Sequence, residues 1–321
     1  MRRSLLVTGL LAAALALGAS AGADDSLAKA NAALEAGNAD GAQSLLNSLP
    51  ATAEVHNLKC RVQFALEHFD AAAHECQTAV NASSENSDSH MWLGRALGEK
   101  ASRASFLTAF SLAKRVCAEF ETAVELDGRN AAALADLGEF YASAPSVVGG
   151  GNDKAARIAT RLDAVDQARA HELRGRIAEG QKDYGTAERA FRQALSASQH
   201  PAFQWMTLAS YYRRREQWTD LDAAIDSGLR AVQRDHRAGV ALFNGASVLS
   251  RANRNLSLSA KMLEEYLEGS QLTEEAPAFV AYTRLAQIRV RLGDKAGAQD
   301  ARAKALALAH DYKPALDLNV K

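Results

Sequence analysis

The chain has 321 residues, of which 48% are hydrophobic and 6% are aromatic, and only five are proline. This composition is too apolar for a disordered chain and is typical of a helix-rich one. Lysine and arginine (37) nearly balance aspartate and glutamate (38), so the charge gives no support for a nucleic-acid partner or for strong attraction to a membrane surface.

Residues 1–23 have the pattern of a secretory signal peptide. Arg2 and Arg3 give a positive start, an apolar run follows at 5–17, and Ala21-Gly22-Ala23 supplies the small residues for cleavage after either alanine. The run is shorter than the roughly 20 residues that span a bilayer, and no later segment is apolar enough to span one. We therefore expect export across the inner membrane, with a periplasmic location in a Gram-negative bacterium.

From residue 24 to 321, small residues recur where the first helix of a helix pair would pack closely against the second. They are Ala30, Cys60, Gly94, Gly138, Gly175, Ala209, Val248 and Ala286. In five of the pairs, another residue suited to packing follows 19 positions later, near the end of the second helix. These residues are Ala79, Ala194, Gly228, Leu267 and Ala305. The spacing predicts eight helix pairs, the first and seventh being the least regular.

The clearest repeat begins at Ala168. Ala187-x3-Phe191-x2-Ala194 places small and aromatic residues on one helical face, and Pro201 ends that helix. Trp205-x2-Leu208-Ala209-x2-Tyr212 then opens the next helix. These residues resemble the tetratricopeptide repeat (TPR), whose signature is W-x2-L-G-x2-Y, then A-x3-F, then P. The resemblance implies an all-α fold, a right-handed α-solenoid of about eight TPR-like helix-turn-helix repeats over residues 24–321.

Two adjacent repeats are longer than the spacing allows, which predicts insertions near 99–112 and 144–152. Because neighbouring repeats carry them, we expect the insertions to meet on one side of the solenoid, where loops often carry binding function. The second insertion contains Gly149-Gly150-Gly151 before a predicted helix. This turn either cradles an anion or supplies positive φ angles, with Asn152 or Asp153 capping the helix.

The chain has three cysteines, Cys60, Cys76 and Cys117. Cys60 and Cys76 fall on the two antiparallel helices of the second pair, so they either form a disulfide in an oxidising compartment or pack as small buried hydrophobic residues. There is no Cys-x2-Cys motif, and none of the eight histidines forms a His-x3-His pair. We expect neither a cofactor nor a metal site.

The TPR resemblance implies a protein-interaction scaffold that binds a protein or peptide segment in a concave groove. The groove positions expected from the repeat spacing are Met91, Arg95, Glu139, Glu172, Arg176, Met206, Ser210 and Arg213. Methionine adapts to irregular apolar ligands, and arginine can hold acidic or backbone oxygens. The lysine-asparagine set of TPR proteins that clamp a terminal carboxylate is missing.

The alternative is a helical enzyme, an α/α-toroid-like hydrolase or lyase acting on an extracellular polymer. Export and helical content support it, and it requires a convergent acid pair or metal set. A closed toroid with acids in a central cleft would favour this enzyme. An open superhelix with a one-sided groove would favour the scaffold.

Overall fold

The computed structural model describes residues 24–235, 237–269 and 272–320, and within these ranges every regular element is helical. The expected signal peptide lies outside the described residues. A helix over residues 24–35 packs with α2 (Ala39–Asn47) to form the first pair. The part of the chain described here contains eight such antiparallel pairs, as the spacing predicted.

The other seven pairs follow in chain order and share one plan, a first helix that turns back into a second. They are α3 (Ala53–Ala65) with α4 (Phe69–Ala82), α5 (Ser87–Arg103) with α6 (Phe106–Leu126), α7 (Ala131–Ser143) with α8 (Asn152–Leu162), α9 (Gln167–Gly180) with α10 (Tyr184–Ala197), α11 (Pro201–Arg214) with α12 (Trp218–Val232), α13 (Gly239–Arg251) with α14 (Leu256–Glu268), and α15 (Ala278–Leu292) with α16 (Lys295–Leu308). The short 3-10 helix η1 (Ser146–Val148) lies between α7 and α8, and α17 (Lys313–Leu316) ends the fold.

The turn within a pair has a recurring backbone conformation. Its residue with positive φ stands seven positions after the small residue of the first helix, as with Gly175 and Lys182. The same relationship holds in six pairs, at Gly37, Glu67, Lys182, Glu216, Asn253 and Gly293. The small residue is needed because the second helix approaches closely. At Gly175, for example, an added Cβ would lie 2.8 Å from the Phe191 ring.

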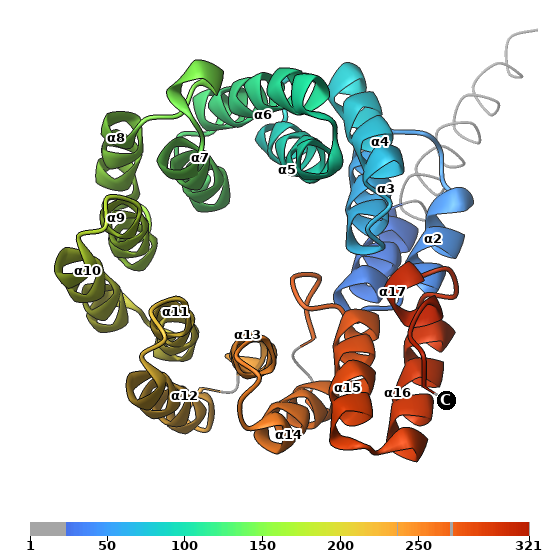
Figure 1. Ribbon diagram of the computed structural model, residues 1–321. Coiled ribbons are helices and arrows are strands. Elements are labelled where there is room, and N and C mark those ends of the chain that lie inside the picture. The colour runs from blue at the N-terminus through green and yellow to red at the C-terminus, as the bar shows by residue number, and fades with distance from the viewer. Residues whose placement is uncertain (1–23, 236, 270–271, 321) are drawn as a thin grey trace, which may run out of the picture.

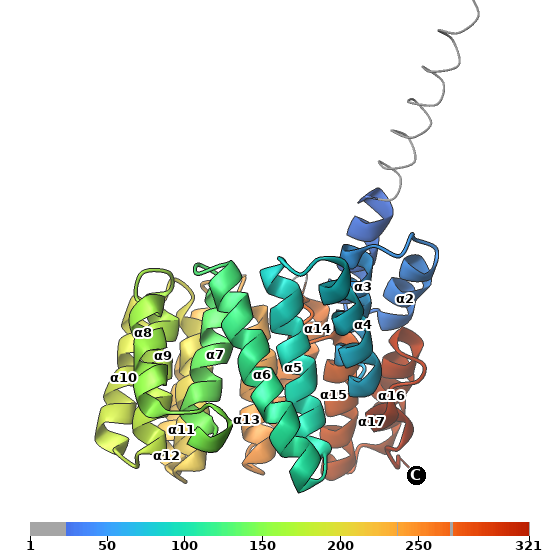
Figure 2. The ribbon, with the colours of Figure 1, turned by 90° about the horizontal axis from the view of Figure 1, so that it is seen from above.

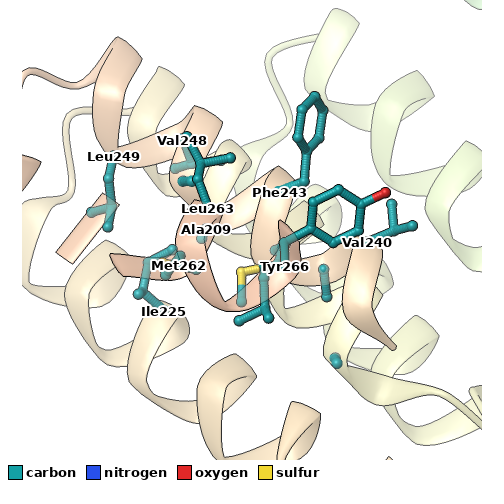
Figure 3. Close-up of a cluster of buried hydrophobic side chains, with 14 of the residues drawn as sticks. Ala209, Ile225, Val240, Phe243, Val248, Leu249, Met262, Leu263 and Tyr266 are labelled. Atoms are coloured by element: carbon teal, nitrogen blue, oxygen red, sulfur yellow. The ribbon is translucent and has the colours of Figure 1, made fainter. Parts of the chain in front are cut away.

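The seventh pair corrects one predicted position. Asn253 and Arg254 donate backbone hydrogen bonds to Ser250 and Leu249 in the pattern that Lys182 and Asp183 show in the fifth pair. This pattern aligns Ala246, which is 1% exposed, with Gly175 as the small packing residue in place of Val248. The shift arises because the turn before α14 contains one more residue than the other turns, with Asn255 as the helix cap. Val248 is also buried, in the apolar cluster that α13 and α14 share with α11 and α12 (Figure 3).

The insertion near 99–112 is helical, which corrects the expectation of a loop. It lengthens α5 to 17 residues and α6 to 21, and it leaves Phe106 and Leu107 exposed at the start of α6. The second insertion contains η1, which packs against α6. An added Cβ at Gly149 would lie 2.7 Å from Cys117 Sγ, so the second insertion packs against α6 beyond the end of the first insertion.

The solenoid closes into a ring (Figure 1). One apolar cluster joins its two ends, with Leu34 and Leu46 from the first pair and Phe279 and Tyr312 from the last repeat and the following segment. Polar contacts cross the same seam. Arg61 Nε donates to Glu274 Oε2 (2.9 Å), and the backbone N–H of His310 donates to Asp40 Oδ2 (3.0 Å). We expected an open superhelix for the scaffold. The packing of the two ends against each other shows a closed ring instead.

A disulfide joins Cys60 of α3 to Cys76 of α4, with 5.1 Å between the Cα atoms, which settles the pairing that the sequence left open. Cys117 is a free, buried thiol. Among the described helices, none combines the length and the apolar character needed to cross a membrane.

Candidate functional site

The first helix of each pair faces the inside of the ring, as α5, α7, α9, α11 and α13 show in Figure 1, and the side view in Figure 2 shows the helices standing side by side around it. A cavity of about 710 Å³ opens on this inner face. Residues of α7, α9, α11 and α13, the turn before α11 and Glu275 line it. The volume falls in the range of about 300–1,000 Å³ that is common for ligand sites.

Polar contacts connect consecutive first helices along this inner face. Arg95 of α5 pairs with Asp136 of α7 (Nε to Oδ2, 2.5 Å), and Glu139 of α7 pairs with Arg176 of α9 (Oε1 to Nη1, 3.3 Å). The guanidinium of Arg95 also stacks on Trp92, 4.6 Å from the ring centroid. The charge of both arginines is therefore already matched by a carboxylate of the neighbouring repeat.

The contact between the next two first helices, α9 and α11, contains no arginine. Glu172 of α9 accepts hydrogen bonds from Gln204 Nε2 (3.2 Å) and Thr207 Oγ1 (3.3 Å) of α11. Burial raises the pKa of Glu172, although Arg176 and the Gln204 hydrogen bond oppose the rise. Burial likewise raises the pKa of Asp136 against the opposing effect of Arg95.

Gln204 is 9% exposed and carries an unsatisfied acceptor in the cavity wall. Within the described chain, its Oε1 atom is buried and has no hydrogen-bond partner. The orientation of the amide is set by Glu172, because turning it over would place two acceptors against each other. A buried carbonyl oxygen without a donor costs about 1–3 kcal/mol, and a ligand N–H would remove that cost once the Gln204 side chain turned this oxygen toward the cavity.

The structure brings three of the eight expected groove residues into the cavity wall, Glu139, Glu172 and Arg176. Arg95 lies next to the wall through its pair with Asp136. Ser210 and Arg213 lie outside the wall, toward the end of α11, where Ser210 accepts a hydrogen bond from Arg214. Burial and the nearby charges of Arg214 and Arg251 lower the pKa of Arg213.

The expectation that Met91 and Met206 face the groove is wrong. They are 5% and 2% exposed, and both belong to the apolar core. Met206 fills the space beside Gly228 and Gly245, where an added Cβ would lie 2.4 Å from its Cε and 2.7 Å from its Sδ respectively. Met206 therefore contributes to packing between its own helix pair and the next one.

Several cavity residues were missed by the sequence analysis, namely Asp136, Arg169, Gln204, Thr207, Asn244 and Glu275. The usable signal was helical spacing. Gln204 and Thr207 are three residues apart on α11, as Glu172 and Arg176 are four apart on α9, so each couple lies on one face. Glu275 precedes α15 in an irregular segment, where no periodicity marks it.

The Gly149-Gly150-Gly151 turn has a packing role. Gly149 and Gly151 have φ of 106° and 155°, and an added Cβ at Gly150 would lie 1.8 Å from the Ala144 carbonyl oxygen. Lys154 Nζ donates to the Gly149 carbonyl (2.9 Å), which holds the turn against α8. Gly151 itself is the N-cap and makes no side-chain capping bond, so the expected cap by Asn152 or Asp153 is wrong.

Residues 168–201 match the family model of the tetratricopeptide repeat, and these residues form α9, α10 and the turn that follows. This stretch of the chain is a tetratricopeptide repeat. Among curated proteins, none matches this chain.

Solved structures of TPR proteins resemble it at low identity. A thermophilic TPR protein of Thermus thermophilus is 19% identical, with a TM-score of 0.48 over 59% of this chain and 97% of its own. A tetratricopeptide repeat protein from Parabacteroides merdae is 12% identical, with a TM-score of 0.42 over 92% of this chain and 98% of its own. The C-terminal part of a TPR protein from Cytophaga hutchinsonii is 16% identical, with a TM-score of 0.42 over 91% and 98% of the two chains.

Proposed function

We propose that this protein is an exported interaction scaffold that holds a peptide segment of a partner protein in the cavity of its ring. The observation that carries the proposal is the buried, unpaired Oε1 of Gln204 in the cavity wall. An extended peptide offers backbone N–H groups that can satisfy such an acceptor. The amide of Asn244, which is exposed in the same wall, offers a second pair of donor and acceptor groups.

Export is part of the proposal. The positive start, the apolar run and the Ala21-Gly22-Ala23 triplet support a cleaved signal peptide. The Cys60–Cys76 disulfide fits an oxidising compartment such as the periplasm. N-terminal sequencing of the exported protein should return Asp24 or Gly22 as the first residue, and a chain that begins at Met1 would contradict export by this route.

The binding test uses a variant that fills the cavity. Asn244→Trp places a large side chain at an exposed position of the wall, so the fold should tolerate it. Partners cross-linked and purified from the envelope fraction with the wild-type protein should be lost with Asn244→Trp. Glu265→Trp, on the outer helix α14, is the matched control and should retain them. Equal capture by all three proteins would move the binding surface out of the cavity.

The closed ring gives the enzyme alternative one supporting observation, because carboxylates line its interior. The contacts of these carboxylates favour the scaffold. Asp136 and Glu139 are each paired with an arginine, and Glu172 accepts two hydrogen bonds from α11. The separating assay is release of reducing ends or unsaturated products from envelope polysaccharides. Release by the wild type that is abolished in Glu172→Gln would support the enzyme.

A further inference from the structure

The charge in the cavity wall is unbalanced toward negative. Five carboxylates line the cavity, those of Asp136, Glu139, Asp166, Glu172 and Glu275. Only two guanidinium groups line it with them, those of Arg169 and Arg176. The wall therefore has the charge of a site for a cation.

Ion pairs account for three of the five carboxylates. Asp136 pairs with Arg95 and Glu139 with Arg176, as described above, and Asp166, the N-cap of α9, pairs with Arg169 of that helix at 3.2 Å. In the part of the chain that the structure describes, Glu172 and Glu275 are the lining carboxylates without an ion-pair partner within 4.0 Å. The neighbouring Glu274 is bound to Arg61, which holds the segment before α15 at the inner side of the ring (Figure 1).

We propose that the cavity selects a positively charged segment, in which lysine or arginine side chains pair with Glu172 and Glu275 while a backbone N–H donates to Gln204 Oε1. This inference rests on the proposed function of the cavity as a peptide site and adds the charge of the peptide. Glu172 and Gln204 share a hydrogen bond, so one ligand residue can present its side chain to the first and its backbone to the second.

The environment of Glu172 strengthens the argument from geometry. Its charged form is disfavoured by burial, which raises its pKa, and a ligand cation would offset this cost at the same place. The arginines of this face do not serve an acidic ligand, because Arg95 and Arg176 are each bound to a carboxylate of the adjacent repeat. An acidic ligand would have to displace these pairs and then meet Glu172.

The experiment measures binding of fluorescent peptides to the full mature protein by anisotropy. Short peptides of alternating alanine and lysine are compared with counterparts in which glutamine or glutamate replaces lysine. We expect the lysine peptide to bind most tightly, and Glu172→Gln to weaken it about tenfold, the effect of one charge-assisted hydrogen bond. Glu265→Gln, an exposed acid on α14, is the matched control and should leave affinity unchanged.

The outcomes separate this inference from the function on which it rests. If the glutamine or glutamate peptide binds as tightly as the lysine peptide, the charge selection is overturned and the peptide site stands. If no peptide binds at any charge, both proposals fail. A competition experiment with spermidine tests whether the cavity binds a free polycation. If it displaces the lysine peptide at comparable concentration, the site takes a free polycation, and the assignment to a protein segment is overturned.

Discussion

Gly37, in the first turn of the chain, lies directly against Ala278, the first residue of α15. A Cβ added to Gly37 would stand 2.0 Å from the Ala278 backbone nitrogen, and Gly37 also has a φ of 68°. The contact joins the first repeat to the last, next to the hydrogen bond from His310 to Asp40, which spans 270 positions of sequence. The two ends of the solenoid therefore approach at backbone distance, where only glycine fits.

Gly37→Ala should destabilise the protein through this seam. The added methyl group meets backbone atoms that cannot yield as a flexible side chain would, and the positive φ costs about a further 1 kcal/mol. We expect a loss of about 2–4 kcal/mol in the free energy of unfolding, measured by urea denaturation, together with a larger radius of gyration in solution scattering.

Gly293→Ala is the matched control for this change. Gly293 occupies the equivalent turn of the last pair with a φ of 80°, but nothing lies within 4 Å of an added Cβ. This variant should lose only the roughly 1 kcal/mol of the backbone term. Equal losses in the two variants would show that the seam is not closed in solution.

The disulfide should contribute to stability by restricting the unfolded chain. Cys60 and Cys76 close a loop with a sequence separation of 16, for which loop entropy gives about 3 kcal/mol. The double change Cys60→Ala, Cys76→Ala should lower the free energy of unfolding by about 2–4 kcal/mol. The reductant dithiothreitol should lower the free energy of unfolding of the wild type and of Cys117→Ala, which keeps the disulfide. It should not change that of the double variant. A wild type insensitive to reductant would contradict the prediction.

The repeats could be predicted from sequence because the forces that set them are local. Small residues such as Gly175 recur at fixed distances because two helices of one pair must touch there. Closure of the ring had no such signal, since Gly37 and Ala278 meet only after every intervening pair has added its rotation. The site was partly predictable for the same reason. Met206 was expected in the groove, yet its neighbour Thr207 lines the cavity, and one residue turns a helix by about 100°.

Packing inside the fifth pair gives a prediction that tests the helix register. Ala187 is fully buried, in the cluster that includes Phe191. Ala187→Leu should cost about 1–3 kcal/mol by overpacking. Ala223→Leu, at an exposed position of α12, should change the free energy of unfolding by less than about 0.5 kcal/mol. Urea melts of both variants check the prediction, and equal stability of Ala187→Leu and the wild type would contradict the register.

Glu172 gives a prediction about stability and pH. Its pKa is raised in the folded protein, so the folded state binds this proton more tightly than the unfolded state does. The free energy of unfolding therefore gains from this group as pH falls from the raised pKa toward the ordinary value of 4.5, and the gain is complete below it. At neutral pH the charged carboxylate reduces stability, and Glu172→Gln removes the charge while keeping an oxygen that accepts from Thr207.

We therefore expect Glu172→Gln to melt at a higher temperature than the wild type at pH 7, with the difference shrinking as pH falls from the raised pKa of Glu172 toward its ordinary value of 4.5. Glu188→Gln is the matched control with the opposite sign. Burial opposes ionisation of Glu188, but hydrogen bonds from Tyr212 and Arg192 hold its pKa below the ordinary value. That variant should be less stable than the wild type at pH 7, and its deficit should also shrink in acid.

If Glu172→Gln gained stability and lost the lysine peptide, misfolding could not explain the loss of binding. If Glu172→Gln were less stable than the wild type at pH 7, the buried charge of Glu172 would not destabilise the folded protein. A ligand cation would then have no such destabilisation to offset.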